Sequence, residues 1–195
     1  MAPSRTSSSI ALVVLAVGSL QAAEPPAAPL GIGRAASVHD IASQDLTVLP
    51  DGTGLPPGKG SAKEGASLYA AQCAACHGDR GEGRGDFAAL VGGRGSLAGD
   101  KPVLTVGSYW PYATSLFDYI RRAMPYQGSG ELSANDVYAL TAWILAENRI
   151  VKPGAVLTEK TLPAVQMPNK QGFEDASAKQ ALSSRREGEA HETTR

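Results

Sequence analysis

Two cysteines and one histidine lie within one short stretch of the 195-residue chain, Cys73-Ala74-Ala75-Cys76-His77. At the end of a helix, residues three apart share a face, so both thiols can reach the two vinyl groups on one edge of a porphyrin. His77 lies four residues after Cys73 and can bring a ring nitrogen under the iron. C-x-x-C-H is the attachment signature of c-type haem. The motif therefore predicts one covalent haem c, attached through Cys73 and Cys76, with His77 as the proximal iron ligand.

Two other chemistries use cysteines at this spacing. A thioredoxin-type redox motif expects a βαβ context, and the sequence shows neither strand alternation nor a βαβ unit. A zinc half-site needs further cysteine or histidine ligands, and only His39 and His191 remain, in segments that are typical of coil. Because the chain has two cysteines in all, four-cysteine zinc sites and multi-disulfide scaffolds are excluded.

Iron held by one histidine keeps a second axial position. Soft sulfur opposite histidine raises the reduction potential and closes the iron to external ligands. After the initiator, the chain offers Met124 and Met167, each followed by proline. Met124 lies between two predicted helices, whereas Met167 lies outside the predicted compact region. We therefore predict Met124 as the distal ligand and Met167 as the alternative, while ordinary apolar packing is the other role open to each.

Three further side chains are candidates for contacts with the haem propionates, which carry charge and need partners when partly buried. Tyr109, Trp110 and Arg94 all carry hydrogen-bond donors. The alternative is that the two aromatic residues only pack and that Arg94 is solvated. The sequence leaves both interpretations open.

The elements that would position these residues follow from capping and periodicity. Ser61-Ala62-Lys63-Glu64 matches the S-x-x-E capping box and predicts a helix to about residue 71. A second helix is predicted over 115–123. It ends before Met124-Pro125, because the residue before a proline is driven out of the α region. A third helix is predicted over about 133–147. Residues 78–108 are glycine-rich and predict a long loop. The fold class expected over 61–150 is all-α, three to four helices around one haem.

Composition supports a cofactor in the core and excludes one class of partner. With 22 glycines, 13 prolines and 6% aromatic residues, the side chains alone would build a thin core, which a large apolar cofactor would complete. The 18 basic and 19 acidic residues leave a net charge of −1. A nucleic-acid-binding protein would carry a basic excess, so no nucleic-acid partner is expected.

The chain begins with a pattern typical of a secretory signal. Residues 1–9 are polar with one positive charge, residues 10–20 are largely apolar, and small residues follow before Glu24. We predict a signal peptide over 1–23 and a periplasmic location. The apolar run is too short for a membrane span of about 20 residues. After removal of the signal, no transmembrane segment is expected.

The segments on either side of the predicted domain are expected to be mostly irregular. Residues 24–60 form a Pro/Gly-rich arm with one short helix near 38–43, whose apolar residues favour partial docking. Residues 151–175 are predicted to be an extended wrap. The polar, aromatic-free residues 176–195 predict a disordered tail.

The pattern from Glu64 to Leu145 resembles a monohaem class I c-type cytochrome. The resemblance implies a first helix ending in C-x-x-C-H and a last helix that crosses it. Gly65 and Tyr69 match the crossing positions of the first helix, and Leu140 and Trp143 match those of the last. A glycine lets two backbones approach, and the aromatic rings bury area over the crossing.

A closer resemblance covers about residues 30–175. Segments 30–36, 51–58, 107–113 and 116–125 are similar to the c-type cytochrome subunit of the sulfane dehydrogenase of the sulfur-oxidising (Sox) system. That subunit carries two haems, and this chain, with one C-x-x-C-H, matches one haem domain. The resemblance implies haem held by the motif cysteines and histidine, with methionine as distal ligand.

The same resemblance implies a partner and a role. It predicts an electron-transfer protein rather than a catalyst by itself, accepting electrons from a molybdenum-cofactor dehydrogenase of sulfite-oxidase type in sulfur-compound oxidation. A downstream cytochrome or oxidase would take the electrons onward. Two alternatives remain: a free-standing electron shuttle, and a haem enzyme or sensor with an open distal site.

Overall fold

The computed structural model describes residues 32–174. The chain has two structural units, Met1–Ser37 and Val38–Arg195, and the elements below all belong to the second. The predicted signal peptide over 1–23 and the predicted tail over 176–195 lie outside the described residues. Within 32–174, no helix combines the length and the hydropathy that a membrane span requires.

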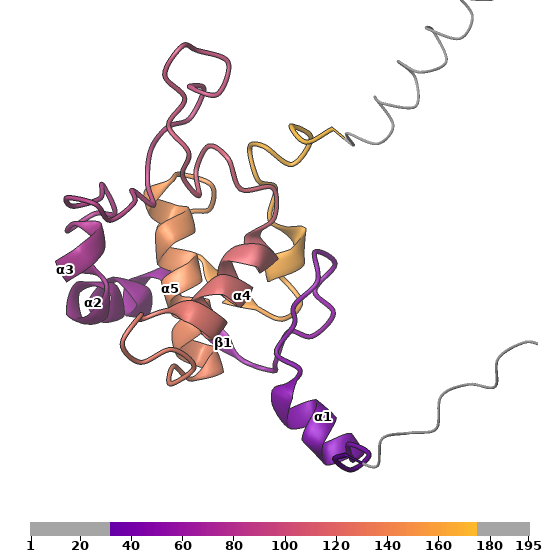
Figure 1. Cartoon of the computed structure of the whole chain (residues 1–195). Coiled ribbons are helices and arrows are strands. Elements are labelled where there is room, and N and C mark those ends of the chain that lie inside the picture. Colours follow the sequence, from indigo (N-terminus) through magenta and orange to yellow (C-terminus); the bar gives the residue numbers. More distant parts are fainter. Residues whose placement is uncertain (1–31, 175–195) are drawn as a thin grey trace, which may run out of the picture. The chain divides into compact units, whose positions relative to one another are not determined.

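Helix α5 (Ala134–Glu147) is the element on which most others pack. It begins as its sequence predicts, in a capping box: Ser133 Oγ accepts the N–H of Asp136, and the Asp136 carboxylate accepts the N–H of Ser133. Every residue from Val137 to Leu145 is buried. Helices α2 (Ala62–Gln72) and α4 (Ala113–Ala123) both contact it, and Figure 1 shows α5 between them.

The crossing of α2 over α5 depends on one glycine and one aromatic pair. The capping box predicted at Ser61 and Glu64 is present and starts α2. Gly65 is buried against the backbone of Ala139 in α5. One turn later, the rings of Tyr69 and Trp143 stack with centroids 3.8 Å apart. The first and last helices of the domain therefore meet at the positions that the resemblance implies.

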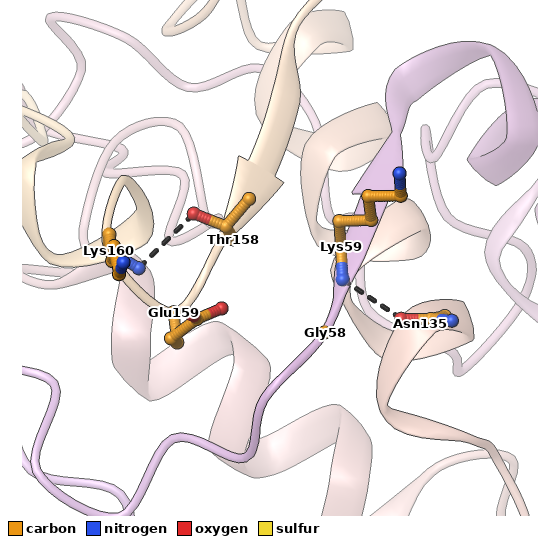
Figure 2. Close-up of a pocket in the computed structure, with 6 residues that line it drawn as sticks. All are labelled: Gly58, Lys59, Asn135, Thr158, Glu159 and Lys160. Carbon is orange, nitrogen blue, oxygen red and sulfur yellow. Dashed lines mark hydrogen bonds between the residues drawn. The ribbon is translucent and has the colours of Figure 1, made fainter.

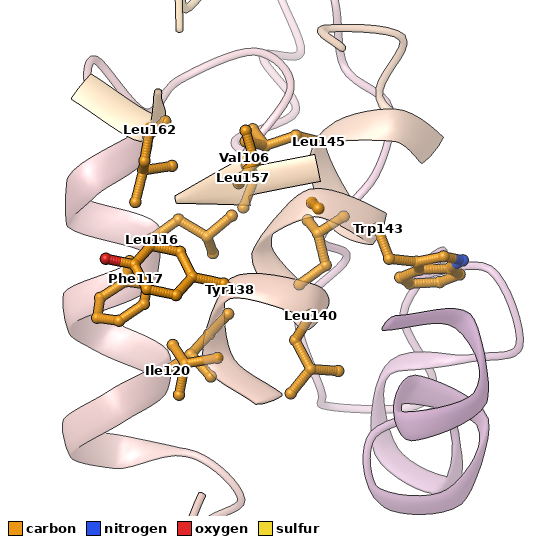
Figure 3. Close-up of a cluster of buried hydrophobic side chains, with 14 of the residues drawn as sticks. Val106, Leu116, Phe117, Ile120, Tyr138, Leu140, Trp143, Leu145, Leu157 and Leu162 are labelled. Atoms are coloured by element: carbon orange, nitrogen blue, oxygen red, sulfur yellow. The ribbon is translucent and has the colours of Figure 1, made fainter. Parts of the chain in front are cut away.

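Helix α4 covers the other side of α5. Leu116, Phe117 and Ile120 are buried, and the ring of Phe117 lies 4.5 Å from that of Tyr138 between centroids. Figure 3 shows this cluster, with Trp143 pointing to the opposite side, toward α2. The core thus has two halves, one on each side of α5.

The segments outside 61–150 contribute to this core. Strand β1 (Lys59–Ser61) pairs antiparallel with β2 (Val156–Thr158), with Gly60 opposite Leu157. The single-turn helix η1 (Leu162–Ala164) follows. Four core residues lie outside the predicted range: Val48, Leu157, Leu162 and Met167. The sequence predicts extended coil after 151, and the structure adds β2 and η1, which are too short to leave a periodic pattern.

The arm contains the predicted short helix, α1 (Val38–Gln44). Fewer of the arm's apolar side chains are buried than its composition suggests. Val48 is buried, whereas Ile32 and Ile41 are exposed. The chain leading into β1 is held instead by hydrogen bonds to α5: the N–H of Lys59 donates to Asn135 Oδ1 at 2.9 Å.

The phenol of Tyr138 predicts a loss of stability at alkaline pH. Its hydroxyl donates to the carbonyl of Pro56 at 2.9 Å, and burial raises its pKa from 10.0 to about 12. In the unfolded chain the phenol ionises first, so its contribution is complete below pH 10 and is lost as the pH rises toward 12. We expect the free energy of unfolding to fall across this window, and to fall less steeply in Tyr138→Phe, as measured by urea denaturation at a series of pH values. An equally steep loss of the free energy of unfolding with pH in the two proteins would contradict this.

Candidate haem site

The C-x-x-C-H motif forms one turn of helix. Cys73 ends α2 and precedes the short helix α3 (Ala74–His77). The N–H groups of Cys76 and His77 both donate to the carbonyl of Cys73, at 3.1 and 2.9 Å. Both cysteines are half-buried and free of any disulfide. One turn of backbone therefore presents two thiols and an imidazole, the arrangement that attachment of a porphyrin edge requires.

His77 is oriented by a backbone carbonyl. Its Nδ1 lies 2.9 Å from the oxygen of Ala88. A carbonyl only accepts, so Nδ1 carries the proton and Nε2 keeps its lone pair. A metal-binding histidine ordinarily donates its other ring N–H in this way, which fixes the tautomer and the ring plane. The imidazole is thus prepared to bind iron through Nε2.

A buried tyrosine holds the chain just after the motif. Tyr69 is 1% exposed, and its hydroxyl donates to the carbonyl of Gly78 at 2.9 Å. Gly78 has φ = +82°, a backbone conformation that favours glycine. The ring that stacks on Trp143 therefore also fixes the end of α3, which couples the helix crossing to the position of His77.

The thiol chemistry differs from that of a redox-active pair. Burial raises the pKa of the Cys73 thiol to about 11, with the neighbouring Cys76 as a second cause. Reactive cysteines have a lowered pKa because the thiolate is the nucleophile. Across residues 32–174, no group of three or more His, Cys, Asp or Glu side chains is placed to hold a metal ion. Haem attachment therefore fits the residues better than thiol–disulfide exchange or zinc binding.

Asn148, at the C-terminal end of α5, is hydrogen-bonded to the loop that carries Ala88. Its Nδ2 donates to the carbonyl of Leu90 at 3.1 Å, and its Oδ1 accepts the N–H of Gly92 at 3.1 Å. A second donation, to the carbonyl of Ile144, anchors the side chain to α5 at 2.9 Å. No motif marks this residue in the sequence, because its two partners in the loop lie more than fifty positions away.

Replacing Asn148 by alanine is expected to destabilise the protein strongly. The change removes three hydrogen bonds and leaves a buried N–H and carbonyl oxygens without partners, which predicts a loss of about 2–4 kcal/mol in the free energy of unfolding. Guanidinium denaturation of the haem-loaded protein measures it. Asn169→Ala, which removes one hydrogen bond to the carbonyl of Tyr109, is the control and should lose about 1 kcal/mol. Equal losses in the two variants would contradict the role of Asn148.

The two candidate methionines occupy different environments. Met124 is the C-cap of α4, where its N–H donates to the carbonyl of Ile120, and its side chain is half-buried against the core. Met167 is 4% exposed and is a member of the core itself. Only Met124 keeps side-chain surface available to a cofactor. Its assignment as distal ligand stays a prediction.

Half-buried apolar side chains flank α5 on both sides. Leu68 and Cys73 lie on the α2 side, and Met124 and Leu132 belong to the chain that leaves α4 and enters α5. Within the described part of the chain, α3 packs on α2, and neither helix packs extensively on α4. An apolar macrocycle between these groups would complete their burial, so the residues present fit a haem.

The three residues predicted to contact the propionates each contact another part of the protein. The ring of Trp110 meets that of Tyr119 edge-on, at 5.8 Å between centroids, and the ring of Tyr109 meets that of Phe173 at 5.2 Å. Arg94 Nη2 donates to the carbonyl of Asn148 at 3.3 Å. The propionate role of Tyr109, Trp110 and Arg94 stays a prediction.

An open hollow beside β1 and β2 is separate from this motif. Figure 2 shows its lining, which contains no cysteine, histidine or methionine: Gly58, Lys59, Asn135, Thr158, Glu159 and Lys160. The contact between Lys59 and Asn135 across it holds the arm to α5. We assign it no chemistry.

Comparisons with known proteins agree with the geometry of the motif. Residues 60–144 match the family described as cytochrome C oxidase, cbb3-type, subunit III. A chain in the crystal structure of the sulfane dehydrogenase SoxCD from Paracoccus pantotrophus is similar with a TM-score of 0.73 and 44% identity, over 78% of this chain and 75% of that chain. A comparison with curated proteins gave no significant match.

The match to the SoxCD chain covers far more than the haem motif. The aligned share of this chain is larger than the domain match over 60–144, so segments outside that range also correspond. The fold is that of a cytochrome c. This chain belongs to the c-type cytochromes, in the family of the cytochrome c subunit of sulfane dehydrogenase.

Proposed function

We propose that this chain is a periplasmic monohaem cytochrome that transfers single electrons in sulfur-compound oxidation. It accepts them from a molybdoenzyme of sulfite-oxidase type and passes them to another cytochrome or an oxidase. The similarity to a chain of SoxCD supports the sulfur-oxidising context and the molybdoenzyme partner. The predicted signal peptide supports the periplasmic location.

One observation carries the proposal: the hydrogen bond between His77 Nδ1 and the Ala88 carbonyl. It leaves Nε2 free of that contact, on the same turn that presents both cysteines, so three residues of one motif can act together. Haem c, when bound, supplies an iron that exchanges one electron between its ferrous and ferric states. Cys73 and Cys76 would hold the macrocycle, and His77 would bind the iron.

Met124 determines whether the site transfers electrons or binds gases. A Met124 thioether bound to the iron would exclude external ligands and favour simple electron transfer. The half-buried side chain at the end of α4 is suited to that role. An open distal site, as in a haem enzyme or sensor, would leave Met124 as packing only.

The first test is spectroscopic. Purified protein should show a reduced-minus-oxidised c-type spectrum, and the colour should remain with the polypeptide after denaturation and acid-acetone extraction. Mass spectrometry should add the mass of one haem to the mature chain. A colourless polypeptide at the apoprotein mass would overturn the proposal, as would a Cys73→Ser, Cys76→Ser double variant that kept its haem through extraction.

The second test concerns the partner. Expressed together with a molybdenum subunit of sulfite-oxidase type, the tagged cytochrome should co-purify with that subunit, and its haem should be reduced by sulfite or thiosulfate only in the presence of the subunit. A free-standing shuttle would purify alone and accept electrons equally from unrelated donors. Failure with every sulfur oxyanion would count against the sulfur-oxidising role while leaving the haem assignment intact.

A further inference from the structure

A buried carboxylate joins helix α4 to the arm that precedes β1. Asp118, in the middle of α4, is 8% exposed. Its Oδ1 accepts the N–H of Val48 at 3.2 Å, across seventy residues of sequence. Its Oδ2 pairs with Arg122, one helical turn later. Both oxygens therefore have partners, and one of them is the backbone of the arm.

The arm loop (residues 47–55) is rigid enough to act as one side of a clamp. The N–H of Leu49 donates to the carbonyl of Thr53 at 2.9 Å, which closes the loop on itself. Gly54 has φ = +87°, and a Cβ there would lie 1.9 Å from the carbonyl oxygen of Thr47. The loop therefore presents the N–H of Val48 from a fixed backbone.

A second contact ties the same loop to the first turn of α4. Thr114, which is 1% exposed, donates its hydroxyl to the carbonyl of Pro50 at 3.4 Å. The side chain of Val48 is itself part of the core. The arm loop thus contacts α4 within its first two turns, at Thr114 and Asp118.

The end of α4 carries the predicted distal ligand. Met124 is the C-cap of the helix, about 9 Å along the axis from Asp118 at 1.5 Å per residue. Because a helix moves as a rigid element, a restraint on its middle is also a restraint on its cap. The side chain of Asp118 is buried, so removing its acceptor oxygen would leave the N–H of Val48 without a partner.

We propose that Asp118 is a positioning residue for the distal ligand: by clamping the arm loop to α4, it holds Met124 on the iron. This inference rests on the proposed function, in which Met124 is that ligand. The arm is then part of the redox site rather than a linker.

The test compares Asp118→Ala with Asp118→Asn in the haem-loaded full chain. Alanine leaves the buried N–H of Val48 without an acceptor, whereas asparagine keeps a carbonyl oxygen in the same place. Asp118→Ala should raise the association constant of cyanide for the ferric protein about tenfold, the ratio equivalent to ~1.4 kcal/mol, close to one hydrogen bond to a charged group. Asp118→Asn should change it less than about twofold, and the absorption band of sulfur–iron ligation should weaken only in the alanine variant.

Ser133→Ala is the matched control for simple destabilisation. It removes the capping box of α5 and lowers Tm by a few degrees without touching α4 or the arm loop. Its cyanide binding should equal that of wild type. If Asp118→Ala and Ser133→Ala lower Tm alike and bind cyanide alike, Asp118 only stabilises the fold and the inference is overturned.

A second variant keeps the test available if Asp118→Ala does not accumulate with haem. Thr114→Val removes only the hydroxyl that donates to the carbonyl of Pro50, and it should raise the association constant of cyanide about threefold. Unchanged binding in Thr114→Val would then overturn the inference. Wild-type protein that already binds carbon monoxide would overturn the proposed function and this inference together. If wild type does not bind it and the variants bind cyanide no better than wild type, the inference alone is overturned.

Discussion

Met124→Ala protein is expected to bind carbon monoxide in its ferrous state, whereas wild-type protein remains closed to it. Removal of the thioether leaves the iron with His77 alone, so the ferric form becomes high-spin and the reduction potential falls. We expect the association constant for carbon monoxide to rise about a thousandfold, equivalent to ~4 kcal/mol. Optical titration of the reduced haem-loaded protein measures it.

Met167→Leu is the control for this prediction. Met167 belongs to the buried core, and exchange of methionine for leucine preserves the volume at a cost below about 1.5 kcal/mol. This variant should stay closed to carbon monoxide. If Met167→Leu opens the site and Met124→Ala does not, the ligand is Met167; if neither does, no methionine binds the iron.

The second large effect is expected at the helix crossing, from a substitution that would ordinarily stabilise a helix. Alanine is favoured over glycine by about 0.8–1.0 kcal/mol in a helix interior. A Cβ at position 65, however, would lie 2.0 Å from the carbonyl oxygen of Ala139 and 2.8 Å from Cβ of Trp143. Both obstacles are close to the backbone of α5 and cannot rotate away. We therefore expect Gly65→Ala to lower the free energy of unfolding by about 3 kcal/mol.

Denaturant unfolding and near-ultraviolet circular dichroism test this expectation. Separation of the helices would disturb the stack of Tyr69 on Trp143 and change the aromatic signal. Gly154→Ala is the matched control, because a Cβ there meets nothing within 4 Å, and its effect should stay within about 0.5 kcal/mol. A Gly65→Ala protein as stable as wild type would show that the backbones do not approach as described.

The residues of the predicted haem site lie in three separate parts of the chain. His77 belongs to α3, its orienting carbonyl Ala88 belongs to a loop fastened by Asn148, and Met124 ends α4. His77 and Met124 are predicted from the sequence, whereas no motif marks Ala88 or Asn148. Asn148 acts on the motif only through the loop that carries Ala88, so substitutions outside the C-x-x-C-H turn are also expected to alter the haem.

Local patterns were sufficient wherever the interacting residues are close in sequence. The capping boxes at Ser61 and Ser133, the helix that ends before Met124 and the C-x-x-C-H turn all depend on residues within a few positions. The start of each helix is determined by which side chain can bond to its first free N–H groups. The sequence alone therefore determined the helices of the domain and the chemistry of its central motif.

Tertiary structure alone decided the contacts that span long distances along the chain. The acceptor for His77, the loop held by Asn148 and the clamp between Asp118 and Val48 leave no local pattern. The pairing of β1 with β2 involves three residues on each side, too few for strand alternation to appear. These contacts form only when the folded chain brings their partners together. The sequence therefore determined which residue types could serve a haem, whereas the packed fold determined which of them are oriented by distant partners, as His77 is by Ala88.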